Sequence, residues 1–201
     1  GSDRPFIVTS GIGSLAPGRA ATEEDAPMPS STSYPRASEQ TAVLVAGRGV
    51  RTAVVRLPQV HDPVKQGFVS YLIAIARERG VSAYVGEGSN RWSAVHRLDA
   101  ARLYRLALEK AASDKNAAVA RYHAVGEEGV PTKPIAEAIG QGLKVPVVAV
   151  APERAMQHFG FLGNFAGLDM SASSALTQER LGWHPTGPGL IADLEAMRFD
   201  A

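Results

Sequence analysis

The stretch from Pro5 to Gly13 constrains the fold more than any other part of the chain. It reads Pro-Phe-Ile-Val-Thr-Ser-Gly-Ile-Gly, so a short apolar run leads into two hydroxyl residues and then into glycines. Such a run is typical of a strand that is buried on both faces of a parallel sheet. Ligands of open α/β sheets bind beyond the carboxyl ends of the strands. We therefore expect Thr9 and Ser10 either to meet a ligand or to cap the following turn.

Composition excludes several classes of function. The formal net charge of +1 gives no electrostatic basis for binding nucleic acid or an anionic membrane. The absence of cysteine excludes disulfides and thiolate metal sites, and it is compatible with a cytoplasmic location. None of the five histidines has the spacing of metal ligands. No apolar run approaches the roughly 20 residues of a membrane span. We therefore expect a cytoplasmic protein that binds no metal, nucleic acid or membrane.

A strand–helix–strand pattern follows the first strand. Residues 14–33 form a long polar loop, whose acidic run Glu23–Asp25 we expect on the solvated surface. A helix with a small-residue face begins near Ala37, and the β-rich run Val50–Leu57 ends at Pro58. Without a hairpin signal this pattern predicts parallel strands joined by a right-handed crossover. The carboxyl ends of both strands then border one crevice.

The remaining chain alternates helices and short strands. We expect strands near residues 81–85, 91–96, 121–125 and 145–150, and helices near 64–79, 98–112, 132–143, 152–159, 162–168, 174–181 and 188–197. The pattern predicts the end of a large parallel sheet followed by a smaller mixed α/β lobe.

Several motifs occur in a fixed order. They are the strand Phe6–Gly11, the loop segment Glu24–Pro27, the strand end Val55–His61, the segments Gly86–Asn90 and Ala94–Ala101, and the closing Leu181–Pro185. In this order they resemble the extended short-chain dehydrogenase/reductases, the NAD-dependent epimerase/dehydratase family. The resemblance covers nearly all of this chain and corresponds to the C-terminal two-thirds of the family's pattern.

The resemblance implies an α/β fold with two parts. Residues 1–62 would be the C-terminal part of a Rossmann dinucleotide-binding domain, without its glycine-rich N-terminal half. Residues 63–201 would be a substrate lobe with interleaved sheet strands. The cofactor would be NAD or NADP.

The resemblance also implies roles for particular residues. Thr9, Ser10 and Tyr34 would be catalytic, because the family combines a strand-end hydroxyl with a tyrosine that exchanges the substrate's hydroxyl proton. The cofactor would contact Thr9 and the backbone of Leu57, Pro58, Gln59 and Val60. The substrate would contact Gly11, His61 and Trp92, although packing in the core is the alternative for Trp92.

The chain departs from the family pattern in two ways. The glycine-rich turn G-x-x-G-x-x-G that holds the pyrophosphate is absent from the sequence. The Tyr-x-x-x-Lys pair is also absent, because Ser38 or Glu39 stands where lysine is expected. Neither side chain supplies the cation that lowers a tyrosine pKa, although Arg36 could substitute in part.

Two functions are therefore predicted. The first is an NAD(P)-dependent oxidoreductase or epimerase, present as a fragment, that acts on a carbinol or carbonyl carbon of a small or sugar-like substrate. The alternative is a non-catalytic sensor or scaffold that binds a dinucleotide. We expect a homodimer or pairing of this chain with the missing N-terminal half.

Overall fold

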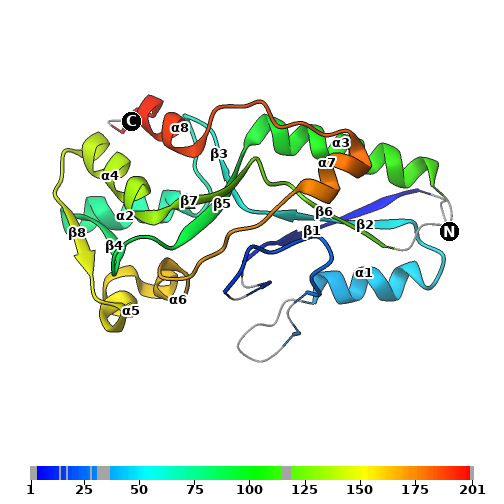
Figure 1. The fold of residues 1–201 in the computed structure, drawn as a ribbon, viewed down its shortest axis with the longest axis horizontal. Helices are drawn as coiled ribbons and strands as arrows, with labels where there is room; N and C mark the ends of the chain where they lie inside the picture. The colour runs from blue at the N-terminus through cyan, green and yellow to red at the C-terminus, as the bar shows by residue number, and fades with distance from the viewer. Residues whose placement is uncertain are drawn as a thin grey trace.

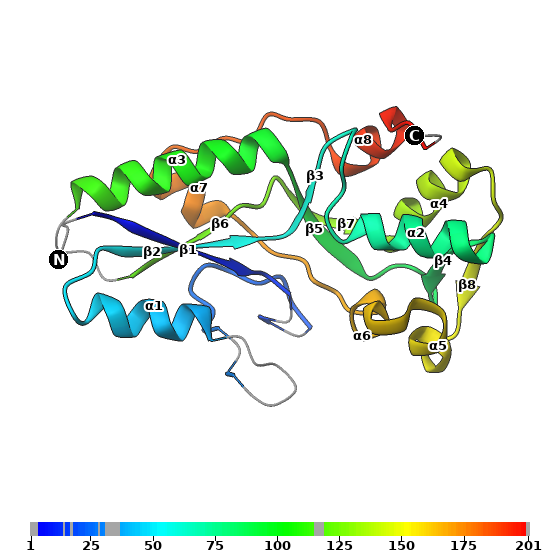
Figure 2. The same ribbon diagram turned by 180° about the vertical axis from the view of Figure 1, so that it is seen from behind.

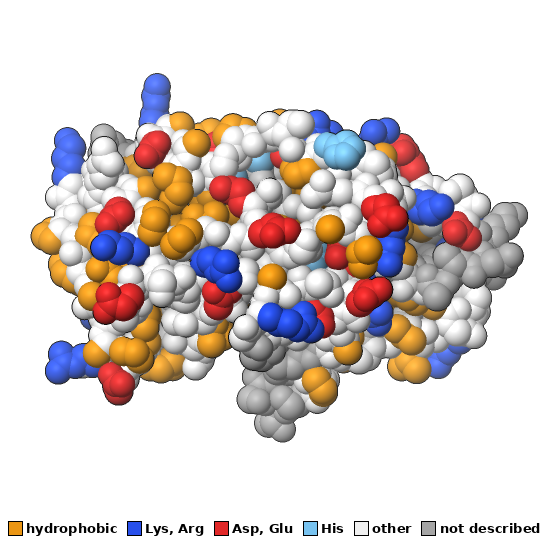
Figure 3. All heavy atoms as spheres, viewed as in Figure 1, with side chains coloured by type: hydrophobic (Ala, Val, Ile, Leu, Met, Phe, Trp, Pro, Cys, Tyr) orange, Lys and Arg blue, Asp and Glu red, His pale blue; other side chains and the backbone are white. Residues whose placement is uncertain are grey.

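A computed structural model describes residues 4–13, 15–16, 18–27, 29–30, 37–114 and 119–199. The described chain is elongated, with a parallel sheet at one end and a mixed lobe at the other (Figure 1). On the face seen in Figure 3, acidic and basic side chains are interspersed. None of the described helices is long and apolar enough to cross a membrane.

The parallel sheet contains three strands in the order β1-β2-β6. These are β1 (Phe6–Gly11), β2 (Thr52–Leu57) and β6 (Ala120–His123). Helix α1 (Ser38–Ala46) covers one face and helix α3 (Arg97–Ser113) the other (Figure 2). The predicted crossover between two parallel strands is confirmed, because β1 and β2 pair in parallel on either side of α1 in the sequence.

The second lobe is built on two smaller sheets. One contains β3 (Gln59–His61), β5 (Arg91–His96) and β7 (Glu127–Pro131), and the other pairs β4 (Ser82–Val85) with β8 (Val147–Val150) in parallel. The larger helices of this lobe are α2 (Val69–Arg79) and α4 (Thr132–Leu143). The shorter ones are η1 (Pro152–Arg154), α5 (Ala155–Phe159), η2 (Gly160–Leu162), α6 (Gly163–Ala166) and α8 (Leu190–Ala196). Helix α7 (Ala175–Leu181) lies instead beside α3 and β6, at the end of the molecule that holds the parallel sheet (Figure 2).

Separate apolar cores stabilise the two ends. One core packs Leu103 of α3 against Val55 of β2 and Tyr122 of β6. Another packs Trp92 of β5 among helices α2, α4 and α8. Strand β6 is part of the parallel sheet, and α3 packs on that sheet, although both follow α2 in the sequence. The chain therefore leaves the second lobe and returns to it.

The first strand differs from the expectation of a strand buried on both faces. Phe6 is 51% exposed, and Thr9 is also exposed. The reason is the place of β1 in the sheet: it pairs with β2 on one side, and no other described strand pairs with it. An edge strand receives less cover from the crossing helices than a central one, so its apolar residues stay partly open to water.

Two local expectations were also wrong. Helix α2 begins at Val69 and not near residue 64, because Asp62 accepts hydrogen bonds from the backbone of Val64 and Lys65 and forms a turn there. Strand β7 was not predicted, since its sequence Glu-Glu-Gly-Val-Pro is poor in β-branched residues. Antiparallel pairing with β5 holds it in an extended conformation.

Candidate functional site

A row of polar side chains crosses the parallel sheet near the carboxyl ends of its strands. The register places Ser10 of β1 beside Arg56 of β2, and Arg56 beside His123 of β6. The three residues share the sheet face that α1 covers, because Ser10 and Arg56 both contact Glu39 of that helix and His123 contacts the guanidinium of Arg56. This row is the polar centre of the sheet.

Thr9 points to the opposite face of the sheet. Its hydroxyl forms a hydrogen bond of 2.7 Å with the hydroxyl of Tyr104 on α3. Neighbouring residues of a strand alternate between faces, so Thr9 and Ser10 cannot both contact one small ligand group. Burial raises the pKa of Tyr104, and the bond to Thr9 only partly offsets this rise.

Arg56 is buried completely, and its charge is neutralised by Glu39. Its Nε and Nη2 atoms donate to the two carboxylate oxygens over 2.9 and 2.8 Å. Nη2 also donates to the carbonyl of Asp25 over 2.8 Å. Burial alone would raise the pKa of Glu39, but the Arg56 guanidinium, the Ser10 hydroxyl and Arg121 outweigh it and hold the pKa below its usual range. Glu39 is therefore ionised at neutral pH.

His123 completes this row as a neutral imidazole. Arg56 can only donate, so the Nε2 atom of His123 accepts from Nη1 over 3.2 Å. The Nδ1 atom must then carry the proton, which it donates to the carbonyl of Ser173 over 2.9 Å. Burial lowers the pKa of His123 and so favours this neutral form.

Glu23 does not lie on the solvated surface as expected. Only 3% of it is exposed, and its Oε1 atom accepts from the backbone N–H and the hydroxyl of Thr177 over 2.7 and 2.6 Å. Thr177 lies in the first turn of α7, whose free N–H groups attract a carboxylate. Glu23 thereby ties the loop after β1 to the C-terminal part of the chain.

A second polar cluster lies where β3, β5, β7 and α8 meet. The Nδ1 atom of His61 is 2.7 Å from the carboxylate of Asp193, and its Nε2 atom is 3.9 Å from Glu127. The ring of His96 stands edge-on to that of His61 at a centroid distance of 6.0 Å. Burial lowers the pKa of His61, and the two carboxylates only partly oppose this effect.

The segment after β2 continues the chain beyond the carboxyl end of that strand. Leu57, Pro58 and Val60 are half-buried, and Leu57 lies in register with Gly11 of β1. Gln59 is buried, and its side-chain oxygen accepts from the first N–H of α2. Gln59 thereby joins this segment to the start of α2.

The other predicted site residues have different surroundings. His61 is 1% exposed and Trp92 is 2% exposed. Trp92 packs in an apolar core, which was the alternative to substrate contact for this residue. Tyr34 lies outside the described residues. No group of three His, Asp or Glu residues within the described ranges could hold a metal ion.

Sequence reasoning missed the buried charges. Arg56 and His123 were not considered as site residues, although Arg56 interrupts the apolar run of β2 and so carried a detectable signal. A charged residue inside an apolar strand is rarely buried without a partner. The sequence did not indicate that this partner is Glu39, since Glu39 lies in another element.

The structure defines the chain as an α/β protein with a Rossmann-type parallel sheet, as predicted. Solved structures with this fold include a UDP-glucose 4-epimerase of Thermus thermophilus in complex with NAD (TM-score 0.67, 17% identity, 98% of this chain and 63% of that chain). A dTDP-glucose 4,6-dehydratase of Streptomyces venezuelae with NAD bound is another (TM-score 0.67, 19% identity, 98% of this chain and 60% of that chain). At these identities the likeness shows a common fold.

Relatives are also found at the level of sequence. The chain is 47% identical over 198 residues to an uncharacterized protein of Schizosaccharomyces pombe, and 44% identical over 197 residues to an uncharacterized protein of Saccharomyces cerevisiae. The matches cover 96% and 98% of this chain but 64% of each relative, so the chain spans under two-thirds of their length. No family model matches the sequence.

Proposed function

We propose that this chain is part of an NAD(P)-dependent oxidoreductase or epimerase of the extended short-chain dehydrogenase/reductase family. The substrate would be a small or sugar-like molecule that reacts at a carbinol or carbonyl carbon. One observation carries the proposal: the carboxyl ends of β1 and β2 lie in register, so that Ser10 and Gly11 stand beside Arg56 and Leu57. The fold shared with NAD-bound sugar-nucleotide enzymes supports it.

The residues present fit one part of a dinucleotide. Leu57, Pro58, Gln59 and Val60 would hold the nicotinamide end, which supplies a hydride acceptor or donor when bound. The sequence has no glycine-rich turn for the pyrophosphate. We therefore propose that the dinucleotide binds to a longer protein that includes this chain, in which a further strand pairs with the outer edge of β1.

The substrate would occupy the crevice between the two parts, taken as residues 1–62 and 63–201. Ser10 or Thr9 would orient its oxygen, one of the two only, because they face opposite sides of the sheet. Tyr34 would exchange a proton with the substrate hydroxyl. Gly11 would border the substrate directly, and the buried His61 and Trp92 would form the wall behind it.

Calorimetric titration with NADH and NADPH tests the proposal on a protein with the full length of its relatives. Saturable binding of either dinucleotide is expected, because Leu57, Pro58, Gln59 and Val60 would hold its nicotinamide end. Absence of binding for both would show the proposal to be wrong. Turnover of an alcohol or sugar nucleotide, lost in Tyr34→Phe, would further assign the proton transfer to Tyr34.

One observation favours the alternative, a non-catalytic dinucleotide-binding sensor or scaffold. Glu39 stands at one of the two positions where the family has lysine, and its carboxylate is held in the buried pair with Arg56. A negative charge raises a tyrosine pKa, whereas the family's lysine lowers it. Dinucleotide binding without turnover of any alcohol or sugar nucleotide would select this alternative.

A further inference from the structure

A cavity of about 540 Å³ lies in the second lobe, at the carboxyl end of β8. Its lining comprises residues 149–151, Arg79 of α2, and Arg154, Gln157 and His158 of η1 and α5. Figures 1 and 2 show that β8 and α5 lie at the end of the molecule away from the parallel sheet. The cavity is therefore separate from the carboxyl ends of β1 and β2.

The lining of this cavity carries positive charge and no carboxylate. The Nη2 atom of Arg79 donates to the carbonyl of Gln157 over 3.0 Å, which keeps its guanidinium at the cavity. The side chain of Arg154 makes no hydrogen bond or ion pair with any other residue in the described part of the chain. Guanidinium groups without carboxylate partners are the usual protein ligands of phosphate and carboxylate groups.

His158 adds a polar atom that lacks a partner. Its Nε2 atom is buried and has no hydrogen-bond partner among the described residues. Burial and the nearby Arg79 both lower the pKa of His158, so its ring is neutral at neutral pH. A buried polar atom without a partner costs free energy, and an anion oxygen in the cavity would relieve that cost.

We propose that this cavity binds the phosphate group of a small phosphorylated metabolite. Arg154 and Arg79 would bind the phosphate oxygens, and His158 would donate a further hydrogen bond. Ala149, Val150 and Ala151 would contact an apolar part of the same ligand. The volume supports a ligand larger than phosphate alone, since pockets for small molecules span roughly 300–1,000 Å³.

Calorimetric titration of the chain with phenyl phosphate, inorganic phosphate and phenol tests the proposal. Phenyl phosphate should bind more tightly than phosphate, and phenol should not bind measurably. Arg154→Ala should weaken phenyl phosphate binding about tenfold or more, because it removes a charge-assisted contact. The matched control is Arg48→Ala, which removes an equal charge from an exposed position in the other part of the molecule.

Proton NMR gives a second, site-specific readout. An anion beside His158 should raise the pKa of its ring, and Arg154→Ala should reduce this rise. Lack of saturable binding by the native chain would overturn the proposal. So would equal losses in Arg154→Ala and Arg48→Ala, or full affinity in both Arg154→Ala and Arg79→Gln. Dinucleotide binding by the longer protein should survive Arg154→Ala, which separates this proposal from the proposed function.

Discussion

The guanidinium of Arg56 on β2 donates to both carboxylate oxygens of Glu39 on α1, over 2.9 and 2.8 Å. Both side chains are buried, at 0% and 3% exposure. This bidentate pair joins the covering helix to the centre of the parallel sheet. It also means that Glu39 serves as the counter-ion of a strand residue.

Breaking this pair should destabilise the protein strongly. Glu39→Gln leaves the buried Arg56 charge without a counter-ion, so the free energy of unfolding should fall by about 3–5 kcal/mol. Urea unfolding at neutral pH measures the loss. Replacing both residues, as Glu39→Gln with Arg56→Met, should cost less than the sum of the single changes. Additive losses would contradict the pairing.

The His61 cluster should make stability depend on pH. Burial lowers the folded-state pKa of His61 below its ordinary value of about 6.5. The unfolded chain then binds more protons as the pH falls through that value, so stability is present above it and is lost below it. Unfolding free energies measured from about pH 7.5 to about pH 5 should fall less steeply for His61→Gln than for the native chain.

An NMR titration checks the cause of this shift. Asp193 contacts the Nδ1 atom of His61 and favours its protonated form. Asp193→Asn should therefore lower the pKa of His61 further. A rise of that pKa in the variant would contradict the assigned contact.

Glu23 should matter for stability although it lies in an acidic loop segment. Glu23→Ala removes two hydrogen bonds to Thr177 in the first turn of α7, so the free energy of unfolding should fall by about 1–2 kcal/mol. Its exposed neighbour provides the control, since Glu24→Ala should change stability by less than about 0.5 kcal/mol. Equal effects of the two variants in urea unfolding would show that Glu23 is not a cap.

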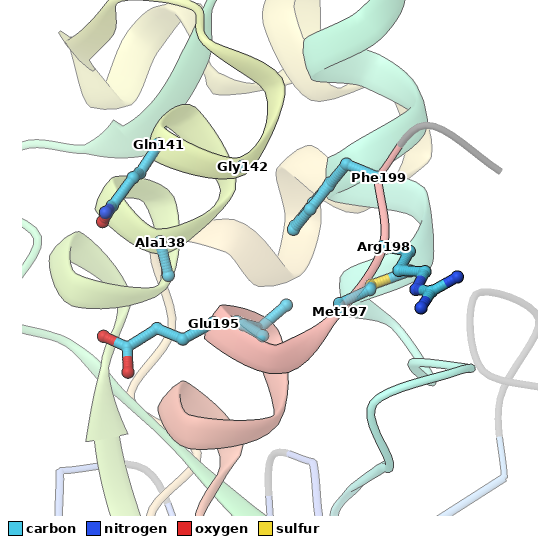
Figure 4. Close-up of a pocket in the computed structure, with 8 residues that line it drawn as sticks. Ala138, Gln141, Gly142, Glu195, Met197, Arg198 and Phe199 are labelled. Atoms are coloured by element: carbon cyan, nitrogen blue, oxygen red, sulfur yellow. The ribbon is translucent and has the colours of Figure 1, made fainter.

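The effect of Gly142→Ala on stability should depend on whether the ring of Phe199 is present. A cavity of about 620 Å³ lies between α4 and the C-terminal segment, and the ring of Phe199 points toward the helix turn that carries Gly142 (Figure 4). A Cβ atom at position 142 would clash with that ring. Gly142→Ala should therefore lower the melting temperature of the native chain.

The same change should be favourable when the ring is absent. In a Phe199→Ala background, Gly142→Ala should raise stability by about 0.5–1 kcal/mol, because alanine is the better helix former. Thermal unfolding of the four proteins of this cycle gives the coupling. Destabilisation of similar size in both backgrounds would show that the ring is not the obstacle.

Much of the local structure could be predicted because its signals are local. Helix α3 was expected at residues 98–112 and spans Arg97–Ser113, since a negative first-turn residue and an apolar stripe define it within its own sequence. Strand β7 was missed because its extended form depends on β5, more than 30 residues earlier in the chain. A segment of five residues that is held by long-range pairing need not show the alternating hydrophobic pattern of a strand.

The sequence by itself determined the parallel crossover from β1 to β2 and the approximate place of most of the other helices and strands. These follow from short apolar runs, turn residues and helical periodicity. Only the tertiary structure decided which buried charges meet. Glu39 and His123 reach Arg56 from residues 17 and 67 positions away, and the strand register brings them together. The physical reason is that a buried charge takes whichever partner the packing brings within hydrogen-bond distance, and packing is a property of the whole fold.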